Sequence, residues 1–486
     1  MKPSDSRLRQ LILESPATIT FFLSLLLSFI ARFPKVTVNR DGMLYTETAR
    51  IFIEQGLDAA LNSFDWLAYP ALIGIFGYLT GLPYEAAGHV LGALLLAGAC
   101  AIMVKQVQVF MPGQGWLACL IVLSIPAMNS GRDEILREDG YWLFMLLSFW
   151  LATRAPTRGQ LLNLLAPSVA LGCAALFRVE AAAFYPALVL WQWYALGKKR
   201  TLRNGLYLFF PLLVLAMAVM VILLLDMIDL RRIQSYWHAV SPANLIERFE
   251  THAEKMAQAA LSHYIHDEAS IVLFCGLLGL LGVVYLGHLG ILVVPLAYAL
   301  ARRKEKTFSL QPFGWLFLTY ACVAVAFITS RFFISDRYIT LLGILSIPLI
   351  VFGSSLLWQR FPRARYLFAG VLILISLDNV ISLRPEKSHL VEAGRWLSEQ
   401  QLPRERVFIE DGRVSYYAGW GPRASRGSRD QAYKNAQYKY LVVADQKDLE
   451  TWLNGKNLKQ LAIFPNKKNS AILILEKASP AAKPIN

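Results

Sequence analysis

Long apolar stretches, separated by short polar segments, make up most of the first 383 residues of the chain. Many of them approach the ~20 residues that a helix needs to cross the ~30 Å hydrocarbon core of a bilayer. The pattern therefore predicts an α-helical polytopic membrane protein with about 11 spans. The predicted spans cover residues 14–33, 84–104, 114–130, 140–153, 160–177, 181–197, 205–226, 270–300, 312–330, 338–358 and 366–383. The run at 270–300 is long for one crossing and leaves room for an interfacial portion.

Three longer polar segments interrupt this pattern. Residues 34–83 form a first loop, in which 45–55 and 70–80 predict short helices that lie at the membrane interface. Residues 227–268 form a second long loop, rich in histidine and charge. Residues 384–486 turn polar and predict a small α/β domain after a transmembrane module at 1–383. Its expected strands are 406–411 and 440–445, and its expected helices are 391–400 and 449–461.

The composition excludes a water-soluble globule. Hydrophobic residues make up 56% of the chain and charged residues only 17%, whereas soluble proteins are about 25% charged. The net charge of +14 does not call for nucleic acid as a partner, because Lys and Arg collect in the cytoplasmic loops of membrane proteins.

The positions of these basic residues predict an orientation. If the N-terminus lies in the cytoplasm, the loops on that side are almost purely basic. They contain Lys105, Arg154, Arg158, Lys198, Lys199, Arg200, Arg302, Arg303, Lys304, Arg360, Arg363 and Arg365. We therefore predict a multi-pass protein of the cytoplasmic (inner) membrane, with the C-terminal domain on the periplasmic side.

The loops predicted on the outer face instead mix acidic residues with arginine. A charge at membrane depth costs several kcal/mol unless it is paired or hydrated, so these groups are expected to surround a polar cavity. An acid there can act as a general base, and arginine binds phosphate bidentately. A sugar carried on a membrane lipid phosphate suits both groups, because phosphate is a good leaving group that positive charge stabilises.

Four charged motifs on this face resemble those of the GT-C glycosyltransferases, in particular the bacterial branch similar to aminoarabinose transferases and protein O-mannosyltransferases. The motifs are Asn39-Arg40-Asp41-Gly42-Met43-Leu44-Tyr45, the segment 132–142, Phe177-Arg178-Val179-Glu180 and Ser335-Asp336-Arg337-Tyr338. The resemblance extends over nearly the whole chain. It implies transfer of a sugar from a polyprenyl-phosphate donor to an acceptor hydroxyl on the outer face, with inversion at the anomeric carbon.

The resemblance also implies roles for single residues. Asp41 matches the general base of the first loop. Many members carry two adjacent acids there, whereas Gly42 follows Asp41 in this chain, and Glu47 is the alternative base. Asp133 and Glu134 are expected in the catalytic site, more in positioning the substrate than as the primary base. The residues expected to bind substrate are Arg40, Tyr45, Arg132, Arg137, Arg178, Glu180, Arg331, Asp336, Arg337 and Tyr338.

Each of these assignments has a structural alternative. Asp41 precedes a helical pattern and is a typical N-cap residue. Asp133 and Glu134, with arginines on both sides, fit a solvated loop whose ion pairs contribute ~0–1 kcal/mol. Arg178 fits a snorkelling arginine at the end of a span, and the arginines near the tenth span fit an interfacial belt.

The sequence also bears on a possible metal site, on the acceptor and on alternative functions. His263 and His266 have a spacing that suits a divalent metal, but a wet amphipathic loop explains them equally well, so we predict no metal site and no required cofactor. The acceptor is a lipid, a glycan or a protein hydroxyl. The alternatives to a sugar transferase are a transporter or flippase of lipid-linked sugars, and a ligase that transfers a whole oligosaccharide.

Overall fold

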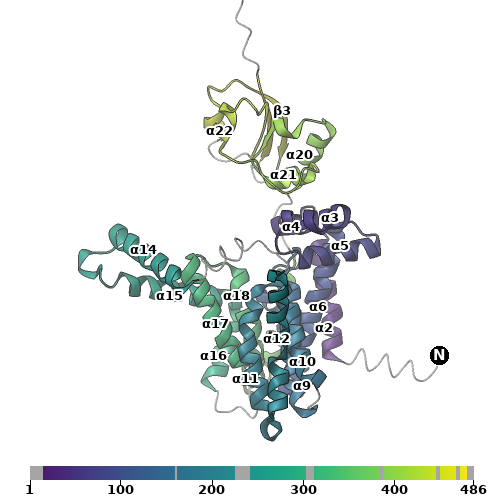
Figure 1. Ribbon diagram of the computed structural model, residues 1–486, viewed down its shortest axis with the longest axis vertical. Helices are drawn as coiled ribbons and strands as arrows, with labels where there is room; N and C mark the ends of the chain where they lie inside the picture. The colour runs from purple at the N-terminus through teal and green to yellow at the C-terminus, as the bar shows by residue number, and fades with distance from the viewer. Residues whose placement is uncertain are drawn as a thin grey trace, which may run out of the picture. The chain divides into compact units, whose positions relative to one another are not determined.

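The computed structural model describes residues 15–158, 161–224, 241–302, 311–381, 387–444, 449–466 and 471–478. Most of these residues are helical, and the strands among them form one small four-stranded sheet near the C-terminus (Figure 1). The prediction of a mainly helical chain with strands near its C-terminal end is therefore confirmed. The boundary predicted after residue 383 lies outside the described residues.

The chain divides into two compact units. The bundle unit contains residues 1–26, 94–130 and 137–380, and the sheet unit contains residues 27–93, 131–136 and 381–486. The α-helices before residue 380 are α2 (Pro16–Arg32), α3 (Arg40–Gln55), α4 (Leu57–Ser63), α5 (Ala68–Thr80), α6 (Tyr84–Phe110), α7 (Gly115–Ser124), α8 (Pro126–Asn129), α9 (Glu138–Arg158), α10 (Leu161–Phe177), α11 (Tyr185–Ala195), α12 (Leu202–Leu224), α14 (Pro242–Ala260), α15 (Ala269–Leu289), α16 (Val293–Ala301), α17 (Gln311–Arg331), α18 (Asp336–Arg360) and α19 (Ala364–Asp378). Short 3₁₀ helices are η1 (Val179–Phe184), η2 (Gly197–Lys199), η3 (His263–Ile265) and η4 (Gly290–Leu292).

Four helical segments of the described chain are long and apolar enough to cross a membrane. They are Tyr84–Phe110, Ala269–Ala301, Phe313–Arg331 and Asp336–Arg360. Shorter apolar helices occupy other predicted spans, and a proline explains why one of them, α7, is short. Ile125 is extended before Pro126 and ends α7 after 10 residues. The membrane character is thus supported, and the count of about 11 spans stays a prediction.

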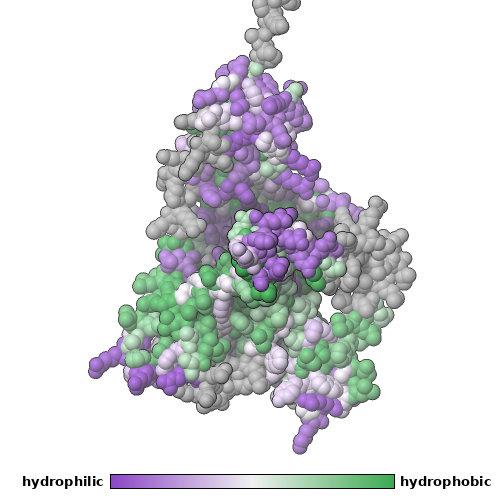
Figure 2. Space-filling view, turned by 90° about the vertical axis from the view of Figure 1, so that its left-hand side faces the viewer, coloured by the Kyte–Doolittle hydropathy of each residue, from purple (hydrophilic) through white to green (hydrophobic). Residues whose placement is uncertain are grey.

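Burial within the bundle unit separates core helices from apolar surface. Nearly every residue of α18 between Ile339 and Ser355 is buried. In contrast, Ile271 and Val283 on α15 are 65% and 69% exposed. Figure 2 shows hydrophobic residues over much of the helical surface and hydrophilic residues over the C-terminal part that holds the four-stranded sheet. Exposed apolar surface of this extent suits contact with lipid.

The first loop of the sheet unit folds into three helices, α3, α4 and α5. The two short helices predicted at 45–55 and 70–80 are therefore confirmed as parts of α3 and α5. The ring of Tyr45 packs between those of Phe64 and Tyr69, with centroid distances of 5.7 and 5.4 Å. This aromatic contact fixes the three helices against one another.

The C-terminal part of the sheet unit is a small α/β domain. Its strands are β1 (Val407–Ile409), β2 (Tyr440–Ala444), β3 (Leu458–Pro465) and β4 (Ala471–Lys477), and its helices are α20 (Ser388–Glu399), the 3₁₀ helix η6 (Arg404–Arg406), α21 (Gly412–Tyr417), α22 (Arg429–Lys434) and α23 (Leu449–Leu453). The strand order is β1-β2-β4-β3, in which only the β1–β2 pair is parallel. Alternate side chains of the sheet pack against α20 and α21 on one face and against α22 and α23 on the other.

One secondary-structure prediction in this domain is wrong. The helix expected at 449–461 ends at Leu453 in the structure, because Gly455 adopts a positive φ of 77° that stops it. Residues 458–465 instead form β3, which pairs with β4. Strand β4 itself was not predicted.

Candidate functional site

Asp41 lies in the first turn of α3, as its second residue. The helix N-cap is Asn39, so the interpretation of Asp41 as the N-cap is wrong. The Asn39 side chain makes no capping hydrogen bond and instead pairs with the backbone of Ile135. Its Oδ1 accepts from the Ile135 N–H at 2.9 Å, and its Nδ2 donates to the Ile135 carbonyl at 3.3 Å. The start of α3 is thus tied to the segment that contains Asp133 and Glu134.

Gly42 explains how closely these two segments approach. A Cβ atom at this position would lie 2.4 Å from Asn39 Oδ1, 2.7 Å from Val38 Cγ1 and 3.0 Å from Ile135 Cβ. Carbon atoms in contact normally lie ~3.5–4.0 Å apart. Many members of the resembled family carry a second acid at this position, whereas a side chain here would collide with Val38, Asn39 and Ile135.

An ion pair and an arginine hydrogen bond also hold the segment 132–134 in place. Lys35 Nζ lies 3.1 Å from Asp133 Oδ2, and both side chains are about three-quarters buried. Arg132 is 6% exposed and donates from Nη1 to Ser28 Oγ at 2.8 Å. Asp133 and Arg132 therefore hold defined positions in the sheet unit, which differs from the freely solvated loop considered as their structural alternative.

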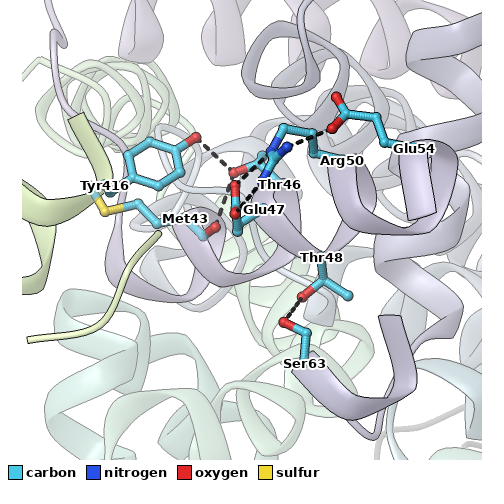
Figure 3. A network of polar contacts seen from close by, with 8 residues as sticks. All are labelled: Met43, Thr46, Glu47, Thr48, Arg50, Glu54, Ser63 and Tyr416. Atoms are coloured by element: carbon cyan, nitrogen blue, oxygen red, sulfur yellow. Dashed lines mark hydrogen bonds and ion pairs between the residues drawn. The ribbon is translucent and has the colours of Figure 1, made fainter. Parts of the chain in front are cut away.

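The C-terminal domain also contacts α3 and the residue that precedes its N-cap. Tyr417 Oη accepts a hydrogen bond from the Val38 N–H at 2.9 Å. The Tyr416 and Thr46 hydroxyls share a hydrogen bond of 2.9 Å (Figure 3). Both tyrosines lie on α21, so this short helix contacts the chain just before Asp41 and one turn after it.

Glu47, the alternative base, forms an ion pair within α3. Both of its carboxylate oxygens accept from Arg50, at 3.1 Å from Nε and 2.8 Å from Nη2 (Figure 3). Arg50 also donates to Glu54 at 2.5 Å. This Glu–Arg–Glu network therefore occupies the carboxylate of Glu47.

A second charged cluster lies in the bundle unit around Arg178. Its Nη1 donates to Glu138 Oε1 at 2.8 Å, and its Nη2 donates to Glu180 Oε1 at 2.7 Å. The guanidinium carbon also lies 4.9 Å from the centre of the Tyr338 ring. Gly140 permits this arrangement, because a Cβ there would lie 2.1 Å from the ring of Phe177, the residue before Arg178.

Burial makes the Arg178 cluster a strongly coupled charge network. The side chains of Arg178 and Glu138 are 5% and 7% exposed. Burial raises the pKa of Glu180, but the hydrogen bond and positive charge of Arg178 outweigh it and hold that pKa below the usual range. Glu138 Oε2 and the Tyr141 hydroxyl have no hydrogen-bond partner among the described residues. Arg178 is thus a buried ion-pair centre, unlike a snorkelling arginine.

The remaining predicted residues occupy the ends of helices in the bundle unit. Arg331 ends α17 and Asp336 begins α18, and both are exposed. Arg337 is half-buried beside Tyr338, whose ring stacks on Phe327 at 4.0 Å. The positive charge of Arg137 contributes to the lowered pKa of Glu180. Tyr338 therefore joins the Arg178 cluster directly.

The predicted residues thus fall into two groups. Arg40, Asp41, Tyr45 and the segment 132–134 belong to the sheet unit, whereas Arg137, Arg178, Glu180 and the segment 331–338 belong to the bundle unit. Sequence reasoning assigned no role to Lys35, Glu138, Tyr416 or Tyr417, or to the Asn39 side chain. A paired Tyr-Tyr in a polar domain is the only local signal for the two tyrosines.

The histidine pair shows no further metal ligands in the described chain. The rings of His263 and His266 lie 5.5 Å apart, and His266 Nε2 is 3.3 Å from the Leu261 carbonyl. Within the described ranges, no group of three or more His, Cys, Asp or Glu residues could hold a metal ion.

Neither protein-family models nor curated protein sequences assign the chain to a family. No protein-family model matches the chain, and no curated protein sequence matches it significantly. The functional assignment therefore rests on the residues and contacts described above.

Proposed function

We propose that the chain is an integral membrane glycosyltransferase of GT-C type, which transfers a sugar from a polyprenyl-phosphate donor to an acceptor hydroxyl at the outer face of the membrane. One observation carries this proposal. Two hydrogen bonds between Asn39 and Ile135 join the loop that bears Asp41 to the loop that bears Asp133. These two residues are 96 positions apart in the sequence. The Lys35–Asp133 ion pair joins the same two loops. Two acidic motifs that are distant in the sequence thus belong to one compact unit and are tied together there.

The chemistry requires few groups. The Asp41 carboxylate accepts the proton of the acceptor hydroxyl as its oxygen attacks the anomeric carbon. The bond from that carbon to the phosphate oxygen breaks, and its electron pair leaves with the phosphate. A single displacement of this kind inverts the anomeric configuration. Positive charge near the leaving group stabilises the negative charge that develops on the phosphate.

Arg178 has a different role in this proposal from that of a direct phosphate ligand. Two carboxylates already occupy its guanidinium, so its contribution is to hold the ends of α9 and α10 together. Arg331, at an exposed helix end, is better placed to bind the phosphate of the donor.

The proposal includes the topology that the basic loops predict, with about 11 spans and both Asp133 and Asp411 outside. Cysteine labelling tests it in a variant without the five native cysteines, of which Cys275 and Cys322 are exposed. An impermeant maleimide should label Glu134→Cys and Asp411→Cys on intact cells, and should label Lys198→Cys only after lysis. Labelling of Lys198→Cys before lysis would contradict the topology.

Reconstitution separates the proposed activity from its rivals. The full chain in proteoliposomes is supplied with radiolabelled polyprenyl-phosphate sugars and with lipid, glycan and peptide acceptors. A transferase forms a new glycosidic bond to one acceptor and releases polyprenyl phosphate. A flippase would move the labelled lipid between leaflets without forming a bond, and a ligase would transfer only a preassembled oligosaccharide.

A further inference from the structure

A pocket of about 260 Å³ lies where α3 meets the C-terminal domain. Arg40 and Met43 line it from α3. Glu410 lines it from the loop after β1, Arg413 from α21, and Ala424 from the loop after α21. Pockets for small molecules typically measure about 300–1,000 Å³. This pocket lies just below that range, so a single sugar head group is the largest ligand it suits, and it is too small for a lipid tail.

The acidic groups at this pocket are already paired. Arg413 donates from Nε to Asp411 Oδ1 at 2.9 Å and from Nη2 to Asp411 Oδ2 at 2.5 Å. Burial raises the pKa of Asp411, but its bonds to Arg413 and the charge of that residue hold the pKa below the usual range. Glu410 accepts from Arg429 Nε at 2.8 Å. These carboxylates add no free negative charge to the pocket.

Two cations beside the pocket have no such partner. Among the described residues, no carboxylate forms an ion pair with Arg40 or Lys387. The pKa of Lys387 is lowered by burial and by the positive charges of Arg413 and Arg40, although Asp411 opposes this. Lys387, Arg413, Arg40 and Asp411 are therefore close enough to interact. Because Asp411 is paired with Arg413, the charges of Arg40 and Lys387 remain uncompensated. A phosphate monoester carries about −1.5 to −2 charges at neutral pH.

We propose that this pocket binds the phosphorylated sugar of the acceptor, with Arg40 donating to the phosphate and with Lys387 adding positive charge. The identity of the ligand as an acceptor rests on the proposed function. Two observations favour the acceptor over the donor. One wall belongs to a domain with a hydrophilic surface (Figure 2), and the apolar lining is limited to Met43, Pro422 and Ala424, which gives a polyprenyl chain no groove.

Direct binding of a soluble probe tests this assignment. The full chain in phosphatidylcholine nanodiscs is titrated with glucose 1-phosphate, and binding is followed by phosphorus NMR. Loss of one charged hydrogen-bond donor costs ~1.5–3 kcal/mol, so Arg40→Gln should weaken binding by about 10-fold to 150-fold. Ala424→Trp, which fills the pocket from an exposed position, should abolish it. Arg395→Gln changes an exposed arginine on α20 outside the pocket and should bind like the wild type.

Several results would overturn the assignment. The assignment fails if Arg40→Gln and Arg395→Gln bind the probe equally, or if the wild type binds glucose as tightly as glucose 1-phosphate. It also fails if the wild type does not bind the probe at all. Displacement of the probe by farnesyl phosphate would instead mark a donor site. Asp41→Asn should retain binding. If the probe binds through Arg40 but no donor yields a glycosidic bond, the proposed function fails and the pocket stands. Transfer without such binding removes the pocket alone.

Discussion

Gly42→Ala adds one methyl group at the closest approach between α3 and the second acidic segment. The new Cβ would lie 2.4 Å from Asn39 Oδ1 and 3.0 Å from Ile135 Cβ. The amide oxygen cannot simply rotate away, because it accepts the hydrogen bond from the Ile135 N–H. Either α3 or the Ile135 segment must therefore move.

The expected loss of stability follows from two opposing effects. Overpacking a buried site costs ~1–3 kcal/mol, and the better helix propensity of alanine returns up to ~1 kcal/mol. With the full helix-propensity gain, we expect a net destabilisation of up to about 2 kcal/mol, with a weakened Asn39–Ile135 contact and reduced sugar transfer. The assay is thermal unfolding in one detergent, followed by tryptophan fluorescence, together with the transfer assay.

Gly172→Ala provides the matched control, because it is an exposed helical glycine whose added Cβ would meet nothing within 4 Å. It should be neutral or stabilising by up to ~1 kcal/mol. If Gly42→Ala unfolds at the same temperature as Gly172→Ala or above it, the close packing inferred at the start of α3 is refuted.

Two further predictions concern the charged and phenolic groups. Arg178→Met leaves Glu138 buried without its partner and should cost ~3–5 kcal/mol in unfolding free energy, whereas Arg331→Met at an exposed site should change it by at most ~0.5 kcal/mol; equal effects would contradict the buried network. Burial raises the pKa of Tyr417 to about 12, above the ~10 of an unfolded tyrosine. Because the unfolded state then loses its proton first, the stability that Tyr417 contributes is complete below pH ~10 and is lost as pH rises toward ~12. The stability difference between wild type and Tyr417→Phe should shrink over that interval, and a constant difference would contradict the assignment.

The sequence predicts the helical elements well where hydrophobicity alone determines them. The runs at 84–104 and 270–300 correspond to long apolar helices, and the structure resolves the second run into α15 and α16, separated at Gly290. Hydrophobicity could not set the length of the helix that begins at Gly115, because Pro126 ends it. It also could not show that 458–465 is a strand, since that depends on pairing with β4.

In the candidate site, too, the sequence predicts local contacts but not long-range ones. Arg178 and Glu180 are two residues apart, so their ion pair follows from local spacing. The Val38–Tyr417 hydrogen bond joins residues 379 positions apart, and no periodicity in the chain encodes such a partner. Gly42 was a departure from the resembled family's motif, and the positions of Val38, Asn39 and Ile135 around it explain why no larger residue fits. Long-range packing therefore decides which charged residues meet.

The rate of sugar transfer by Asp41→Asn, compared with that by Asp58→Asn, tests the central claim most directly. Both acids lie in the first turn of a helix in the first loop, and Asp58 is exposed on α4. A general base contributes about 10²–10⁴ in rate, so Asp41→Asn should lose at least ~100-fold while the donor still binds. Asp58→Asn should transfer at the wild-type rate. Equal rates for the two variants would show that the proton of the acceptor hydroxyl goes to another group.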